Sequence, residues 1–243
     1  MALRSLLLAA LLGILVTGCN KKVETPEATP ASAPVVATPA AAPPVVVQGN
    51  RANFTITRTA EGYTLADKSG KEPAINVKAE QRIRFSDITM SLDTKGNPGA
   101  AYRLYYAAFN RAPDHAGLGY WLKALDGGMS LEAIAEMMVS SAEFAGMYAP
   151  TMSDEELVRT FYKNVLRKDA DAAEIAGWQA KLASKSVTRA QALAAISSGD
   201  VAQKADQLGL EKGIFYTEEG VQYAPFASAN ADPIVNAAAP ATQ

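Results

Sequence analysis

The stretch YRLYYAAF, residues 102–109, decides the fold of the chain. Its aromatic residues recur at the i, i+3, i+4 and i+7 spacing, which places them on one face of an α-helix. The stretch VRTFYKNV, residues 158–165, has apolar residues at the same offsets. Each stretch is followed by an arginine, an aspartate, a second apolar stripe and a short polar tetrapeptide that holds an acid. The sequence therefore predicts one helical unit present twice, from Tyr102 to Phe144 and from Val158 to Val201.

The second apolar stripe of each copy contains a tryptophan, Trp121 in the first copy and Trp178 in the second. Core packing is the favoured interpretation of both indoles, and an aromatic platform for a sugar is the alternative. One copy alone is too small to bury its own core. We therefore expect the two copies to pack their apolar faces together, with both tryptophans inside the seam.

Helix boundaries follow from capping residues. Asp114 and Ser130 are placed to cap the second and third helices of the first copy, and Gly127-Gly128 stops the second. Ser153 with Glu156 forms a capping box at the start of the second copy. The helices of that copy are predicted at about 154–167, 171–184 and 188–198.

An arginine ends the first helix of each copy, and an acid ends each copy. We predict that Arg111 pairs with Glu143 and that Arg167 pairs with Asp200, so that the end of each copy is tied to its start. The alternative is a solvent-facing arginine at a helix C-terminus, where a cation is favoured in any case.

No catalytic motif emerges from the sequence. His115 is the only histidine and has no neighbouring cluster of ligands, so a surface turn is its favoured interpretation over a metal or acid–base role. The acid pairs Glu155-Glu156 and Asp169/Asp171 lie at helix starts, where the helix dipole stabilises negative charge. The sequence predicts no catalytic site, no metal site and no cofactor, although catalytic groups can assemble from distant positions.

The segment before the helices has the alternation of short strands. Residues 54–59 and 63–65 read as a threonine-rich pair, and 82–85 and 90–92 as two further strands. A few strands alone are marginally stable, so we expect them to lie against the helices. After the helices, residues 214–216 and 221–223 predict a hairpin that either completes the sheet begun at Phe54 or caps the bundle.

The N-terminus has the pattern of an export signal. Arg4 is followed by the apolar run 6–16, which is short for a permanent membrane span. Cys19, the only cysteine, follows Val16-Thr17-Gly18. This motif resembles the lipobox of bacterial lipoproteins, and an ordinary secretion signal with a chance cysteine is the alternative.

The lipobox resemblance implies cleavage before Cys19, which would then carry a diacylglycerol and an amide-linked acyl chain. Several acyl chains anchor a protein stably, because each buried methylene contributes about 0.8 kcal/mol. Asn20 stands where an aspartate would, by the usual rule of that family, favour the inner membrane. The resemblance thus implies the outer membrane and leaves both of its faces, the periplasmic face and the cell surface, as alternatives.

The linker after Cys19 is rich in alanine and proline. Prolines at this density block helices and sheet ladders and favour extended chain. At ~3.1 Å per residue, thirty residues would span roughly 90 Å. The linker is therefore interpreted as a spacer, with a tail of no spacing role as the alternative. The formal charge of −2 and the scattered basic residues exclude a nucleic-acid footprint.

The helical repeat resembles a bacterial domain of unknown function, the family numbered four-two-one-four, which is often found beside RTX repeats and is distantly similar to the phycobilisome linker domain. The first copy fits the pattern closely, and the second is looser, with Ala170 and Glu174 replacing its proline and glycine. The resemblance covers roughly residues 100–202. It implies an all-helical fold and a surface setting, but no activity. The matching residues of the first copy are Arg111, Pro113, Asp114, Gly117, Leu118, Trp121, Ser141, Glu143 and Phe144.

The strands at 82–87 and 91–94 resemble the strand module that precedes this domain in RTX-type surface and secreted proteins. The chain lacks the GGxGxD repeats that bind calcium beside that module. Residues 67–70 supply only one carboxylate, whereas calcium sites need several oxygen ligands. Calcium binding is therefore not expected.

The sequence predicts a mainly α fold: a two-copy helical repeat domain with a small antiparallel β segment before it and a hairpin after it. We expect a lipid-anchored, non-catalytic structural or interaction module that binds an envelope protein or a surface glycan. The alternative is a ligand-binding or hydrolytic envelope protein that uses a groove between the two copies. The predicted segments are a signal peptide (1–18), a lipidated cysteine and Pro/Ala-rich linker (19–50), a β-rich segment (51–98), the helical domain with its hairpin (99–226) and a disordered tail (227–243).

Overall fold

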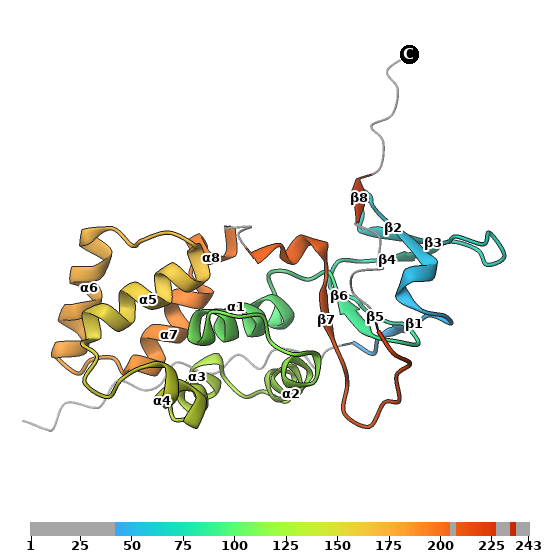
Figure 1. The fold of residues 1–243 in the computed structure, drawn as a ribbon. Helices are drawn as coiled ribbons and strands as arrows, with labels where there is room; N and C mark the ends of the chain where they lie inside the picture. The colour runs from blue at the N-terminus through green and yellow to red at the C-terminus, as the bar shows by residue number, and fades with distance from the viewer. Residues whose placement is uncertain (1–41, 205–207, 227–233, 237–243) are drawn as a thin grey trace, which may run out of the picture. The chain divides into compact units, whose positions relative to one another are not determined.

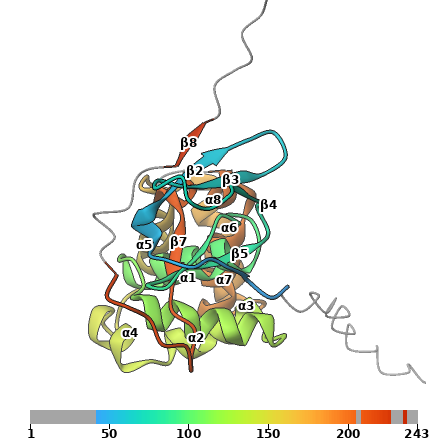
Figure 2. The same ribbon diagram turned by 90° about the vertical axis from the view of Figure 1, so that its right-hand side faces the viewer.

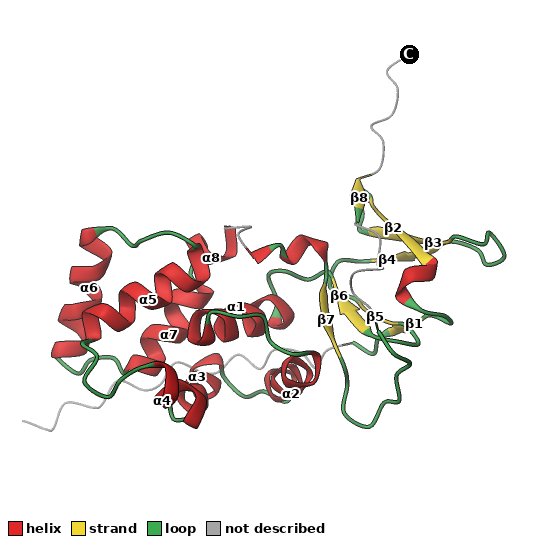
Figure 3. Cartoon of the chain, viewed as in Figure 1, coloured by secondary structure: helices red, strands yellow, loops and turns green. Residues whose placement is uncertain are grey.

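The computed structural model describes residues 42–204, 208–226 and 234–236. The fold is mainly helical, with small sheets beside the helical region, as the sequence predicts (Figure 3). The predicted signal peptide, Cys19 and most of the linker lie outside the described residues. No helix of the described part is long and apolar enough to cross a membrane.

The first copy consists of three helices and a short fourth. As predicted, Asp114 caps the second helix by accepting a hydrogen bond from the Gly117 amide, and Ser130 caps the third by accepting one from Ala133. Ser141 caps the fourth in the same way. The helices are α1 (Asn97–Phe109), α2 (His115–Asp126), α3 (Leu131–Val139) and α4 (Ala142–Met147).

The second copy repeats this order. The predicted capping box of Ser153 and Glu156 is present, and two more boxes begin the next two helices at Asp171 and Thr188. Adding 57 to the bounds of α1 and α2 gives the bounds of the corresponding helices in the second copy. The helices are α5 (Asp154–Leu166), α6 (Ala172–Ala183), α7 (Arg189–Ser198) and α8 (Asp200–Lys204).

The two copies share one hydrophobic core. Helix α1 packs against α5 and α7, and α3 packs against α7, so the first and third helices of the copies meet (Figure 1). Leu104 and Phe161, which are 57 residues apart, are both 0% exposed in this seam. Burial of such side chains is the main stabilising contribution to the fold. The predicted packing of the apolar faces is therefore confirmed.

The strands form two small sheets with a core of their own. The first sheet has the order β1-β5-β6-β7 and the second the order β4-β3-β2-β8. Ile56, Ile83 and Met90, which are 0% exposed, belong to the apolar core that both sheets share. The strands are β1 (Val45–Val46), β2 (Phe54–Arg58), β3 (Tyr63–Asp67), β4 (Ile75–Val77), β5 (Arg82–Arg84), β6 (Thr89–Ser91), β7 (Ile214–Tyr216) and β8 (Val235–Asn236).

Three expectations about the strands need correction. The predicted hairpin is absent from the described residues: β7 pairs antiparallel with β6, while residues 221–226 form no strand. β7 thus completes the sheet of β5 and β6, not the one begun at Phe54. The fold also begins inside the predicted linker, because β1 pairs with β5. Within the predicted disordered tail, β8 pairs with β2 (Figure 2).

The strands meet the helices where β7 runs beside α2. Gly119 in α2 allows the close approach, because a Cβ atom there would lie 1.8 Å from the carbonyl oxygen of Thr217. The amide of Thr217 donates a hydrogen bond to the carbonyl oxygen of His115. The residue after β7 is thereby tied to the start of α2, which fixes the sheet edge on the first helical copy.

Candidate binding groove and the contacts around it

A groove of about 430 Å³ lies on the surface of the helical domain. Glu132 of α3 is the lining residue from the first copy, and the other lining residues come from α6, α7 and the loop between them. Residues of both copies therefore line the groove, and a groove between the copies is where the sequence predicts a ligand site in its alternative interpretation. Its lining residues are Glu132, Trp178, Lys181, Ser186, Val187, Gln191 and Ala195.

Trp178 is the aromatic residue of this groove. Its side chain is half-buried, and its indole nitrogen donates a 3.0 Å hydrogen bond to the Tyr162 hydroxyl on α5. The Lys181 ammonium lies 4.7 Å from the indole ring centroid, a cation–π contact. Burial raises the pKa of Tyr162, so its hydroxyl stays protonated at neutral pH. The indole is thus held in place while it still lines the groove.

The position of the two tryptophans differs from the prediction. Neither indole lies inside the seam between the copies. Both are half-buried and pack against the core from its edge, and Trp121 contacts the exposed Tyr120. Buried side chains of α1 and α5, such as Leu104 and Phe161, fill the seam instead.

Arg111 and Glu143 are paired as the sequence predicts. Arg111 donates two hydrogen bonds to Glu143 Oε1, at 3.1 Å from Nε and 2.8 Å from Nη2. The guanidinium also lies over the Tyr105 ring, 4.9 Å from its centroid. The hydrogen bond to Glu143 raises the pKa of Arg111. The pair ties the start of α4 to the loop after α1, and because it is exposed its contribution to stability is small.

The predicted pairing of Arg167 with Asp200 is wrong. Arg167 donates a 2.8 Å hydrogen bond to Asn110 Oδ1 and another hydrogen bond to the Tyr106 hydroxyl, both in the first copy. Asn110 and Arg167 are equivalent residues, 57 apart, and both have the positive φ of a helix C-cap. Arg167 is thus the counterpart of Asn110 and not of Arg111, and it bonds across the seam.

A one-residue insertion explains why Asp200 does not repeat Glu143. Four residues join α2 to α3, whereas five, Ser184 to Thr188, join α6 to α7. Counterparts therefore lie 58 residues apart after this loop, as the caps Ser130 and Thr188 do. Val201, which is 47% exposed, occupies the position of Glu143.

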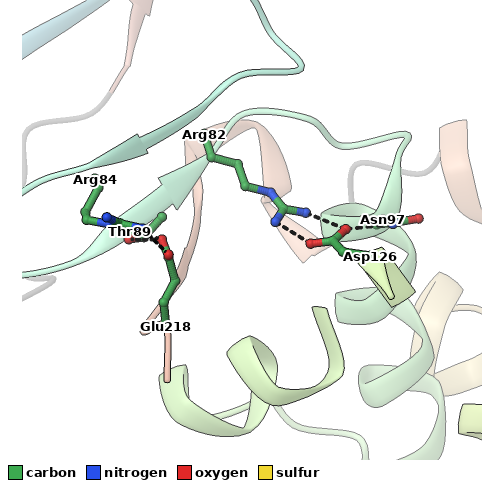
Figure 4. A network of polar contacts seen from close by, with 6 residues as sticks. All are labelled: Arg82, Arg84, Thr89, Asn97, Asp126 and Glu218. Atoms are coloured by element: carbon green, nitrogen blue, oxygen red, sulfur yellow. Dashed lines mark hydrogen bonds and ion pairs between the residues drawn. The ribbon is translucent and has the colours of Figure 1, made fainter. Parts of the chain in front are cut away.

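Polar contacts join β5 to α1 and α2, and others join β5 and β6 to the segment after β7 (Figure 4). Arg82 of β5 donates to both carboxylate oxygens of Asp126 at the end of α2, and Asn97 at the start of α1 donates to the same carboxylate at 2.9 Å. Arg84 and Thr89 both bond Glu218, which follows β7. Partly buried bidentate pairs of this kind fix geometry as well as contribute energy. The network is a structural joint.

His115 lies apart from the groove. Its ring packs edge-on against Phe226, with centroids 5.4 Å apart. Burial lowers the pKa of His115, and the nearby Asp114 carboxylate opposes this shift. His115, Glu143 and Asp200 do not line the groove. The described residues hold no group of three or more metal-ligating side chains.

The groove residues Glu132, Lys181 and Gln191 were not anticipated from the sequence. Glu132 reads as an outward residue of an amphipathic helix, and Gln191 reads as the partner of a capping box. Only Trp178 carried a signal, as the alternative sugar platform. The groove arises from the packing of α3 against α7, which no local pattern specifies.

Comparison with protein families supports the repeat. Two overlapping segments, residues 101–148 and 135–204, match the model of a domain of unknown function (DUF4214). The match supports a repeated helical domain over residues 101–204. No curated protein and no solved structure matches the chain significantly.

Proposed function

We propose that the chain is a lipid-anchored envelope protein that acts as a non-catalytic interaction module. The observation that supports binding is the groove that both copies line, with Trp178 half-exposed beside hydrogen-bonding side chains. A flat aromatic ring next to carboxylate, amide and hydroxyl groups suits a surface glycan or an extended peptide of an envelope protein. The resemblance of the strands to the RTX-associated module is in keeping with a surface setting.

Lipid attachment at Cys19 and outer-membrane residence are the second part of the proposal. They rest on the lipobox Val16-Thr17-Gly18-Cys19 and on Asn20. Labelling with a radioactive fatty acid and membrane fractionation test them. The proposal expects label and outer-membrane recovery for the wild type and neither for Cys19→Ala. Label retained by Cys19→Ala would contradict attachment at this cysteine.

The binding role is tested with the full chain and isolated envelope material. Retention of envelope glycan or protein is compared for the wild type, Trp178→Ala and Trp121→Ala. Both variants lose a half-buried indole, but only Trp178 lines the groove. The proposal expects Trp178→Ala alone to lose retention. Equal retention by all three proteins would refute the groove as the binding site.

The second candidate is a ligand-binding or hydrolytic protein that uses the same groove. Glu132 supplies the carboxylate that a hydrolase would need. Hydrolysis of glycosides usually needs two carboxylates, and Glu132 is the only acid among the described residues that line the groove. The arrangement therefore favours binding over hydrolysis. A glycan-cleaving activity of the full chain that Glu132→Gln abolishes would reverse this preference.

A further inference from the structure

Arg103 on α1 is a buried charge that has no ion-pair partner among the described residues. The residue is 2% exposed, and its guanidinium donates to two backbone carbonyl oxygens, from Nε to Ser197 at 3.1 Å and from Nη1 to Thr94 at 2.6 Å. Its third nitrogen, Nη2, has no hydrogen-bond partner among the described residues. Buried polar atoms are nearly always hydrogen-bonded, so such a group calls for an explanation. Two carbonyls do not neutralise a full positive charge.

Arg103 lines a cavity of about 660 Å³. The cavity lies where the ends of β2 and β3 approach the loop between β6 and α1, and the buried Tyr63 contributes its ring to the wall. Basic and acidic side chains both line it. The charged residues among them are Arg58, Glu80, Asp93, Lys95, Arg103 and Glu211.

The carboxylate of Asp93 is engaged by backbone. Its Oδ1 accepts hydrogen bonds from the amides of Lys95 and Gly96 at 3.0 and 2.7 Å, which shape the loop before α1. Burial lowers the pKa of Arg103, and Asp93 opposes this through its charge at longer range. Asp93 is thus held by the loop, and the buried Nη2 of the cavity residue Arg103 keeps no hydrogen-bond partner among the described residues.

We propose that this cavity binds a small zwitterionic carboxylate, such as a free amino acid, with one carboxylate oxygen accepting from Arg103 Nη2. A single available nitrogen fits one oxygen of a carboxylate. Lys95 and Arg58 add positive charge at the rim. Glu80 and Asp93 disfavour a doubly charged phosphate and favour a ligand that also carries an ammonium group.

Binding to the full chain is measured by NMR titration with three probes: L-alanine, acetate and inorganic phosphate. L-Alanine should saturate with a Kd of about 1 mM, the range for a ligand of so few atoms. Acetate, which lacks the ammonium, should bind several-fold more weakly, and phosphate more weakly still. No saturable binding of L-alanine, or tighter binding of acetate or phosphate than of L-alanine, would overturn the proposal.

Three variants locate the site. Arg103→Lys keeps the charge but withdraws Nη2, and should weaken L-alanine binding about tenfold or more, the scale of a lost charged hydrogen bond. Because Arg103 also holds two backbone carbonyls, the exposed Lys95→Gln provides a variant that keeps the fold and should weaken binding several-fold. Lys163 is exposed on α5 and does not line the cavity, so Lys163→Gln is the matched control and should bind like the wild type. Unchanged binding by both Arg103→Lys and Lys95→Gln would refute the site.

Discussion

The two copies of the helical unit are alike through their second helix and diverge after it. The bounds of their first two helices coincide at an offset of 57 residues, and their third helices begin at an offset of 58. The difference is one residue in the loop before the third helix. Before that loop, equivalent residues of the two copies contact each other across the seam, as Asn110 and Arg167 do. After the loop, residues of the same type no longer occupy equivalent positions in the two copies.

The divergence also separates the roles of the two copies. The first copy carries the joint to the strands, through Asp126 and the start of α2. The second copy supplies most of the groove, through α6, the longer loop and α7. A repeat that is symmetric in its core is thus asymmetric at its surface, where the candidate groove lies.

The largest expected effect comes from the shared seam. Leu104 and Phe161 are equivalent residues, and both are 0% exposed. Leu104→Ala should cost about 2–5 kcal/mol and Phe161→Ala about 3–5 kcal/mol of unfolding free energy. Because the core is shared, each variant should still unfold in a single denaturant transition monitored by circular dichroism. Two separate transitions in either variant would show that the copies fold independently.

The next effect concerns a buried hydrogen bond that a side chain of the second copy donates to the backbone of the first. Asn164, which is 4% exposed, donates a 2.9 Å hydrogen bond to the carbonyl oxygen of its counterpart Ala107 and another to the Tyr148 hydroxyl. Asn164→Ala leaves that carbonyl without this donor and should cost about 1–3 kcal/mol. Urea unfolding measures the loss.

Tyr148→Phe provides the matched test of this network, since Tyr148 also donates to the Ala108 carbonyl at 2.6 Å. The stability losses of Asn164→Ala and Tyr148→Phe should be non-additive in the double variant, because the two side chains share a hydrogen bond. Strictly additive losses would show that the two side chains do not stabilise the fold through a shared hydrogen bond.

A smaller effect compares the ends of the two copies. A double-mutant cycle on Arg111 and Glu143 should give a coupling of about 0.2–1 kcal/mol, the range for an exposed pair. The same cycle on Arg167 and Asp200 should give none, since Arg167 bonds Asn110 and Tyr106. Coupling between Arg167 and Asp200 would restore the symmetric pairing and contradict the one-residue shift.

The smallest effect is a pH dependence confined to the first copy. Burial lowers the pKa of His115 in the folded state, so the unfolded chain binds more protons, and His115 should reduce stability as pH falls through about 6.5. The counterpart in the second copy is Ala172. His115→Ala should flatten this slope in urea midpoints measured on either side of that pH. An unchanged slope would assign the effect to other groups.

Much of the helical fold could be predicted from the sequence because its signals are local. The caps at Asp114, Ser130 and Ser153 and the apolar spacing of α1 and α5 depend on residues a few positions apart. The strand β7 was located as well, but its partner was not. Its pairing with β6 joins segments more than a hundred residues apart, and no local pattern specifies such a pairing.

The candidate site could be predicted only in part. The pairing of Arg111 with Glu143 could be predicted from the helix ends and the opposite charges. The pairing of Arg167 could not, because an arginine in both copies suggests that Arg167 corresponds to Arg111, whereas its αL conformation at the C-cap makes it the counterpart of Asn110. Trp178 is predicted inside the seam, but that place is taken by other side chains, such as Leu104 and Phe161, and the indole packs at the edge of the core. The buried charge of Arg103 gave no sequence signal, because its partners are backbone carbonyls.

If the core is cooperative, the slowest amides of α1 and α5, around Leu104 and Phe161, open with the same free energy in native-state hydrogen exchange of the full chain, equal to that of global unfolding. Slow amides in one copy that remain protected while those of the other open at a much lower free energy would contradict a cooperative core.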